Sequence, residues 1–308
     1  MYLVDGGCLI LSRVRIVAQA SMIFSAGLRS DRLAAKGVVY AKLNPKPKVY
    51  VHLFVTHLQA VYAGSASGAE ECLAVQRKQY RELVEFISST VAANENTSDM
   101  LVAERLLAKK KKGVATPPEQ DTMTFINRRC RRWPIVLAGD FNCNSRPSAG
   151  DVTTRITPQY QDLTAELSKL GSFSDIFFDN LGDHPVTYAA AVFSLDGTFS
   201  PRETALTHPA DYQDDGEWVN QSLDYVFLFP PSHEDVKLIS NTPVAVHGSS
   251  PRSPDSKTIK GSLIRPSELA VKHFEYRPAG NTRAGALQYL SDHMALEALL
   301  SVSSESTH

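Results

Sequence analysis

Several short apolar runs limit the folds open to this chain, because each has the length of a strand and each is bordered by polar residues. Residues 49–56 (VYVHLFVT), 133–138 (WPIVLA) and 223–229 (LDYVFLF) are rich in β-branched and aromatic side chains. Runs of this length are typical of buried β-strands and fall far short of the ~20 apolar residues that cross a bilayer. The chain is therefore expected to build sheets whose strand ends carry the polar groups.

Helical periodicity follows the first of these strands. Residues 71–88 place one set of side chains on a single helical face, namely Leu73, Gln76, Tyr80, Leu83, Val84 and Ile87. This spacing predicts a helix that packs after the strand at 49–56, and a second helical stretch is expected around residues 164–170. A further strand at 37–43 is joined to 49–56 by the turn NPKPK, as in a hairpin. The mixture predicts an α/β sandwich of packed sheets.

Two polar segments interrupt this pattern. Residues 92–131 lose hydrophobic periodicity, and residues 241–267 are rich in Ser, Pro and Lys. Both are expected to be solvated insertions within a single domain that spans residues 1–308. Nine basic and three acidic residues between positions 101 and 132 give that stretch a charge of +6. Its lysine run at 109–112 could meet an anionic membrane surface, but a solvated loop is the simpler interpretation.

Composition excludes several classes of protein. With 32 Lys+Arg against 33 Asp+Glu, the formal charge of −1 gives no global field that would draw the chain to nucleic acid. The four cysteines (Cys8, Cys72, Cys130 and Cys143) lack CxxC spacing, so reduced structural thiols are expected. Neither a spanning segment nor a signal peptide is evident. The expected compartment is the cytoplasm or, if a leader precedes this chain, the outside of the cell.

Polar motifs stand at the ends of the predicted strands. Asp140 and Asn142 belong to GDFN, directly after the run at 133–138, and alternate residues of an extended chain project to the same side. A carboxylate and an amide so placed can both reach a hard cation or a phosphate oxygen, although an ordinary turn would explain the tetrapeptide alone. His57 follows the strand at 49–56, Asp224 opens the run LDYVFLF, and His293 belongs to SDH, a turn before the last apolar strand.

Four such motifs in this order resemble the endonuclease/exonuclease/phosphatase superfamily of Mg²⁺-dependent phosphodiesterases. The match is closest to the neutral sphingomyelinases, through DGGCLILSR at 5–13, Asp31 followed by Lys36-Gly37, THLQA at 56–60 and HPVTY at 184–188. The resemblance implies a four-layer αββα sandwich, as in DNase I. It also implies hydrolysis of sphingomyelin to ceramide and phosphocholine, by attack of water on phosphorus.

The resemblance assigns the proton chemistry to two histidines. His293 corresponds to the general base of the family, and Asp224 would orient its ring. His57 corresponds to the histidine that stabilises the transition state or protonates the leaving oxygen. Asp5, in DGG, is expected to be the hydrogen-bond partner of His57. With Asp140 and Asn142, the residues His293, His57 and Asp224 make up the implied catalytic set. These positions lie far apart in the sequence and are expected to converge in the fold.

The resemblance also implies a metal and phosphate site. Asp140 and Asn142, with Asp292 beside them, would hold Mg²⁺, for which Mn²⁺ or Co²⁺ could substitute. Asn142 and Lys36 would contact the substrate phosphate, and Asp31 precedes Lys36 by the five residues of the family's Asp/Lys pair. An ordinary exposed lysine in a hairpin is the alternative interpretation of Lys36.

The family's central metal ligand is a glutamate upstream of the DGG segment, and no residue of this chain corresponds to it. We therefore expect an N-terminally truncated or mis-started member. The expected partner is a phospholipid at a membrane surface, with no nucleic acid bound and a monomeric state. The alternatives are the same fold acting on nucleic acid or a phosphoinositide, and an inactive truncated member of the family.

Overall fold

The computed structural model describes residues 2–61, 66–95, 132–147, 156–189, 191–193, 199–201, 213–214, 217–218, 220–231, 264–275 and 289–302. The two predicted insertions therefore fall largely outside the described residues. At two of their ends the structure differs from the approximate predicted bounds. Residues 92–94 still belong to a helix, and residues 264–267 already belong to a strand.

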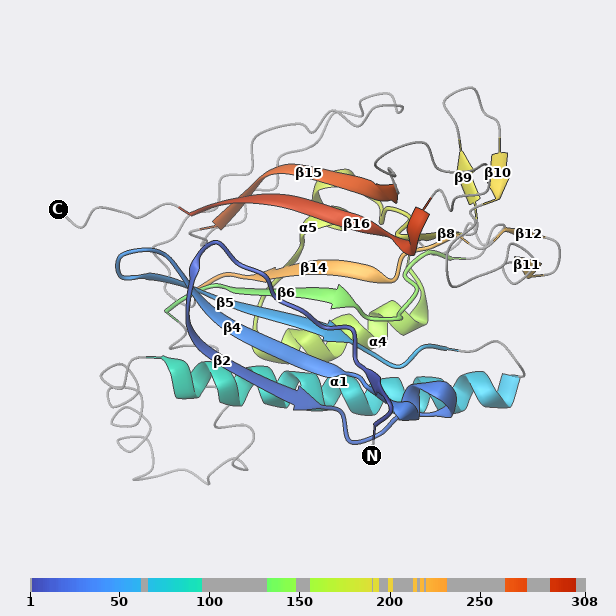
Figure 1. Ribbon diagram of the computed structural model, residues 1–308, viewed down its shortest axis with the longest axis horizontal. Coiled ribbons are helices and arrows are strands. Elements are labelled where there is room, and N and C mark those ends of the chain that lie inside the picture. The colour runs from blue at the N-terminus through green and yellow to red at the C-terminus, as the bar shows by residue number, and fades with distance from the viewer. Residues whose placement is uncertain are drawn as a thin grey trace, which may run out of the picture.

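A six-stranded sheet forms the centre of the molecule (Figure 1). In spatial order its strands are β2 (Arg15–Ile23), β4 (Gly37–Lys46), β5 (Val49–His57), β6 (Ile135–Asp140), β14 (Asp224–Phe229) and β7 (Ser174–Asp175). The predicted hairpin is confirmed, because β4 and β5 pair antiparallel with Val38 opposite Thr56. Only β5 and β6 run parallel within this sheet. Their carboxyl ends therefore meet at one edge.

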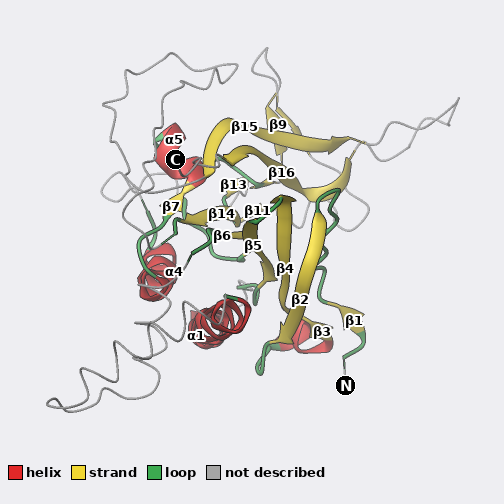
Figure 2. Cartoon of the chain, turned by 90° about the vertical axis from the view of Figure 1, so that its left-hand side faces the viewer, coloured by secondary structure: helices red, strands yellow, loops and turns green. Residues whose placement is uncertain are grey.

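Helices α1 (Ala66–Asn94) and α4 (Pro158–Leu167) cover one face of this sheet (Figure 2). The predicted first helix is confirmed but is longer, and Cys72 rather than Leu73 lies in its buried face. Thr157 caps α4 by accepting a hydrogen bond from the Tyr160 amide, and Pro158 follows it at a position where no amide hydrogen is needed. A short 3-10 helix, η2 (Ser168–Leu170), continues α4. The main core lies between these helices and the sheet.

A second sheet packs on the opposite face. Its strands are β13 (Asn220–Gln221), β8 (Tyr188–Ala189), β16 (Tyr289–Val302) and β15 (Ile264–Glu275). Leu296, Ala298 and Leu300 of β16 pack against a smaller core to which α5 (Ile176–Leu181) contributes Ile176 and Phe177. The predicted α/β sandwich of two packed sheets is confirmed, with helices outside the first sheet.

The predicted turn at SDH was wrong, because residues 291–293 lie inside β16. The ladder pairs His273 with Met294 but Glu275 with Tyr289, so the register shifts beside His293. At His293 itself β16 pairs with β8 instead. A local irregularity of this kind lets a strand aim a side chain away from its ladder.

Several short elements complete the described fold. Near the amino terminus β1 (Val4–Asp5) pairs in parallel with β3 (Ala34–Ala35), which follows the 3-10 helix η1 (Arg29–Leu33). Two small hairpins, β9 (Ala191–Phe193) with β10 (Phe199–Pro201) and β11 (Gln213–Asp214) with β12 (Glu217–Trp218), lie between β8 and β13 in the chain. The amino-terminal segment after β1 reaches the end of β5 at which the predicted residues gather.

Candidate active site

Three strand ends bring the predicted residues together. In the register of the first sheet, His57 at the end of β5 lies opposite Asp140 at the end of β6, and Asp224 at the start of β14 lies opposite Asp140 on the other side. His293 reaches the same place from the second sheet. Because the sheet aligns the carboxyl ends of β5 and β6 with the amino end of antiparallel β14, residues from four distant segments share one site.

His293 and Asp224 form a hydrogen-bonded pair. Nδ1 of His293 lies 2.8 Å from Oδ2 of Asp224, and both side chains are mostly buried. An ionised carboxylate accepts a hydrogen from Nδ1, which fixes the tautomer and leaves Nε2 to face the site. Nε2 of His293 lies 3.9 Å from Oδ2 of Asp140. The predicted pairing of these two residues is therefore present in the structure.

A second histidine, His57, lies near the same carboxylate oxygen. Its Nε2 lies 3.3 Å from Oδ2 of Asp140, and its Nδ1 lies 2.8 Å from the carbonyl oxygen of Gly6. Burial, with a further contribution from the positive charge of Lys36, lowers the pKa of His57 to about 4. The imidazole is therefore neutral at pH 7 in the free chain.

Instead of the hydrogen bond predicted between Asp5 and His57, Nδ1 of His57 donates to the carbonyl oxygen of Gly6. The Asp5 carboxylate instead accepts a hydrogen bond of 2.7 Å from the amide of Gly7, two residues along the chain. This local turn uses the carboxylate and directs the Gly6 carbonyl towards His57. The carboxylate of Asp5 therefore binds the Gly7 amide, and the neighbouring Gly6 carbonyl binds His57.

Asp140 and Asn142 form one rigid turn. Asn142 has a positive φ of 47°, which places its amide 2.8 Å from Oδ1 of Asp140. The side-chain nitrogen of Asn142 donates to Oδ2 of Asp140 at 3.0 Å and to the carbonyl of Leu58 at 3.0 Å. Gln76 of α1 donates to the Asn142 carbonyl at 2.7 Å, so the helix holds the turn against the sheet.

Lys36 and Asp31 form a buried ion pair beside this turn. The Lys36 amine lies 2.9 Å from Oδ2 of Asp31, and each side chain is only 9% exposed, which rules out an ordinary exposed lysine. Lys36 also donates to the Leu58 carbonyl at 2.9 Å, and Asp31 accepts from the Ala60 amide at 2.7 Å. Since Asn142 donates to the same carbonyl, Leu58 links the ion pair to the Asp140 turn.

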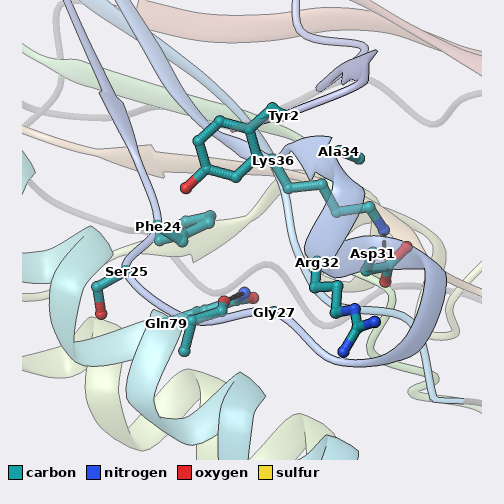
Figure 3. A pocket seen from close by; sticks show the side chains of 10 residues that line it. Tyr2, Phe24, Ser25, Gly27, Asp31, Arg32, Ala34, Lys36 and Gln79 are labelled. Atoms are coloured by element: carbon teal, nitrogen blue, oxygen red, sulfur yellow. Dashed lines mark hydrogen bonds and ion pairs between the residues drawn. The ribbon is translucent and has the colours of Figure 1, made fainter.

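A cavity of about 230 Å³ adjoins the ion pair. Figure 3 shows the Lys36 amine and the Asp31 carboxylate facing each other at its wall, with Arg32 near its rim and Phe24 and Gln79 on other sides. The lining residues come mainly from the loop after β2, from η1 and from α1.

Asp140, Asp224 and His293 can also be considered as metal ligands, because each offers an atom within 4.8 Å of the others. Burial, and next the negative charge of Asp224, raise the pKa of Asp140 well above its ordinary value. Two crowded carboxylates fit a divalent cation, whose charge would relieve this repulsion. Of the predicted ligands, Asp140 and Asn142 lie together here, whereas the side chain of Asp292 is outside the described part of the chain.

Backbone carbonyls were the groups that sequence reasoning missed. The Gly6 carbonyl orients His57, and the Leu58 carbonyl joins Lys36 to Asn142. Every residue has a carbonyl, so no residue type marks these two. Gln76 could have been found, since a glutamine on the apolar face of a predicted helix requires a buried partner.

Comparisons with known proteins agree with the motif resemblance, although no protein-family model matches the chain. A sphingomyelinase of Dictyostelium discoideum is 26% identical over 321 residues, covering 98% of this chain and 62% of that protein. Sphingomyelinase C of Bacillus cereus is 34% identical over 91 residues, or 30% of this chain and 26% of that protein.

Among solved structures, sphingomyelinase C from Streptomyces griseocarneus shares 19% identity with a TM-score of 0.48, covering 96% of this chain and 72% of that one. The chain spans less than two thirds of the length of the two curated relatives described above. Within the described residues, no helix is long and apolar enough to cross a membrane.

Proposed function

We propose that this chain, a homologue of the sphingomyelinases, is a Mg²⁺-dependent phosphodiesterase that hydrolyses sphingomyelin to ceramide and phosphocholine. One observation carries the proposal. The Nε2 atoms of His57 and His293 lie 3.3 Å and 3.9 Å from the same oxygen of Asp140. Two imidazoles close to one carboxylate can supply the base, the acid and the charged centre that hydrolysis of a phosphodiester requires.

His293 is the proposed general base. With Nδ1 held by Asp224 at 2.8 Å, Nε2 carries the lone pair and can accept a proton from the attacking water. Asp224 then stabilises the imidazolium that forms. The new bond joins the water oxygen to phosphorus, and the bond between phosphorus and the ceramide oxygen breaks.

His57 is proposed to assist the leaving oxygen. Its Nδ1 faces the Gly6 carbonyl, so Nε2 is the atom available to the substrate. The free imidazole is neutral, but the negative charge of a bound phosphodiester raises the pKa of a nearby histidine. Protonated His57 could then stabilise the transition state or give its proton to the ceramide oxygen.

The carboxylates of Asp140 and Asp224, with the amide oxygen of Asn142, are the proposed holders of the cation. Asn142 uses its side-chain nitrogen to bind Asp140 and Leu58, which turns its amide oxygen away from these two acceptors. Mg²⁺ bound by these residues would neutralise charge at the phosphoryl oxygens. Lys36 adds positive charge from the side of the ion pair.

The test is a release assay with the purified chain and Mg²⁺. Phosphocholine release from sphingomyelin vesicles is measured beside nicking of plasmid DNA and turnover of a phosphoinositide. The proposal expects release of phosphocholine, and loss of that release in the Asp224→Asn variant. Nicking of DNA or turnover of the phosphoinositide without phosphocholine release would show that sphingomyelin is not the substrate. If none of the three substrates is hydrolysed, the proposed activity is rejected.

A further inference from the structure

We propose that Thr187 and Tyr188 are positioning residues that fix the Asp224–His293 pair from two sides. The inference rests on the proposed function for its kinetic consequence, but its geometric content can be tested separately. Both residues belong to the HPVTY segment that enters β8, and neither has a part in the proton chemistry described above.

Thr187 holds the start of the strand that carries Asp224. Its side chain is fully buried, and its Oγ1 accepts hydrogen bonds from two successive amides, those of Leu223 at 2.9 Å and Asp224 at 3.1 Å. Its own amide donates to the carbonyl of Gln221 at 2.9 Å. One hydroxyl therefore fixes the backbone from which the Asp224 carboxylate projects.

Tyr188 holds the other member of the pair. In the second sheet it is the register partner of His293, and the two rings lie 5.2 Å apart between centroids at an angle of 57°. The Tyr188 ring thus limits the rotation of the imidazole whose Nδ1 must face Asp224. Thr187 thus fixes the backbone of Asp224, and the next residue, Tyr188, fixes the ring plane of His293.

The segment that carries these two residues is firmly anchored. His184 is buried, with Nε2 3.0 Å from Oδ2 of Asp175, and its ring stacks on Phe178 at 4.6 Å between centroids. Tyr160 donates to the same Asp175 oxygen at 2.7 Å, and Arg146 donates to the His184 carbonyl. These contacts give His184 a structural role and fix the start of the segment. The backbone at Thr187 therefore has little freedom to move in response to a substitution.

The first test compares Thr187→Val, which removes the hydroxyl at nearly constant shape, with Thr187→Ser, which keeps it. We expect Thr187→Val to lower kcat by about 10²-fold, the scale of a displaced catalytic group, with KM unchanged because Thr187 is buried beneath the pair. Thr187→Ser should restore kcat. The matched control is Thr164→Val, whose hydroxyl donates to carbonyls within α4 and which should keep full activity.

The second test addresses Tyr188, whose side chain is only half-buried and so tolerates change better. Tyr188→Leu removes the ring face and should lower kcat at constant KM, whereas Tyr188→Phe should retain it. If Thr187→Val does not fold, this pair of variants decides the proposal. Equal kcat values for Tyr188→Leu and Tyr188→Phe would then overturn it.

A crystal structure of each folded variant separates this inference from the proposed function. We expect the distance between Nδ1 of His293 and Oδ2 of Asp224 to lengthen beyond hydrogen-bond range in Thr187→Val or Tyr188→Leu and to stay near 2.8 Å in Thr187→Ser. An unchanged distance in the first two variants overturns the inference. If the unsubstituted chain releases no phosphocholine but these distances change as expected, the proposed function is rejected while the positioning role of Thr187 and Tyr188 is retained.

Discussion

The hydrogen bond to Asp224 determines which ring nitrogen of His293 can serve as the proposed base. With Asp224 2.8 Å from Nδ1, the other ring nitrogen, Nε2, carries the lone pair that can take a proton, and it lies 3.9 Å from Oδ2 of Asp140. We expect His293→Ala to lower kcat by roughly 10² to 10⁴, the usual contribution of a general base. The measurement is phosphocholine release at saturating sphingomyelin. His208→Ala, at a position outside every motif, is the control, and retained turnover in His293→Ala would remove the base assignment.

Lys36 and Asp31 are expected to matter for stability as well as for charge. Lys36→Met leaves the carboxylate of Asp31 buried without its cation, which should lower the free energy of unfolding by about 3–5 kcal/mol. The control is Lys169→Met, which removes a half-exposed amine from its pair with Glu166 and should cost less than about 1 kcal/mol. Urea unfolding measures the free energy of unfolding of both variants. Equal losses of that free energy would contradict the stabilising role of the buried pair.

At the scale of residues, the sequence predicted which side chains converge at the candidate site, but it did not predict the hydrogen-bond partner of each. His57, Asp140, Asp224 and His293 could be found because their types and strand-end positions carry a signal. The partner of His57 could not, because whether a carboxylate or a neighbouring carbonyl faces an imidazole depends on a local turn at Asp5.

Strand β6 must approach β5 closely to bring Asp140 opposite His57. Gly139 permits this with a φ of +139°, and a Cβ there would lie 2.0 Å from the carbonyl oxygen of Thr56. Gly139→Ala should therefore cost more than about 2 kcal/mol of folding free energy and reduce activity, since the strands must separate.

Gly182→Ala is the matched comparison for this element. Gly182 also has a positive φ, 75°, but a Cβ would meet nothing within 4 Å. Its substitution should cost only the roughly 1–2 kcal/mol of a left-handed backbone. Thermal unfolding of both variants tests the prediction, and a similar cost at the two positions would show that β5 and β6 can separate freely.

Elements with strong periodicity were predicted well, and irregular ones were not. The hairpin of β4 and β5 and the helix α1 follow from their apolar spacing. The SDH segment was placed in a turn because polar residues before an apolar run indicate a turn as readily as a shifted register inside β16. Periodicity cannot distinguish a turn from a register shift here, because the register of β16 depends on β8, a strand far away in the sequence.

The whole molecule is expected to gain stability from the cation that its carboxylates would hold. Mg²⁺ at about 100 times its Kd should raise the free energy of unfolding by about 2.7 kcal/mol, because it binds the folded chain. Asp140→Asn should lose most of this gain, whereas Asp162→Asn, at an exposed pair with Arg77, should keep it. Thermal unfolding with and without Mg²⁺ measures the gain, and an equal gain in all three proteins would place the cation elsewhere.

The most direct test of the proposed mechanism is hydrolysis of sphingomyelin in water enriched in oxygen-18. Attack on phosphorus by a water that His293 deprotonates places one labelled oxygen in phosphocholine and leaves the ceramide hydroxyl unlabelled. Mass spectrometry of the two products should show this distribution in a single turnover. Label in ceramide, which requires cleavage of the carbon–oxygen bond, would contradict the account.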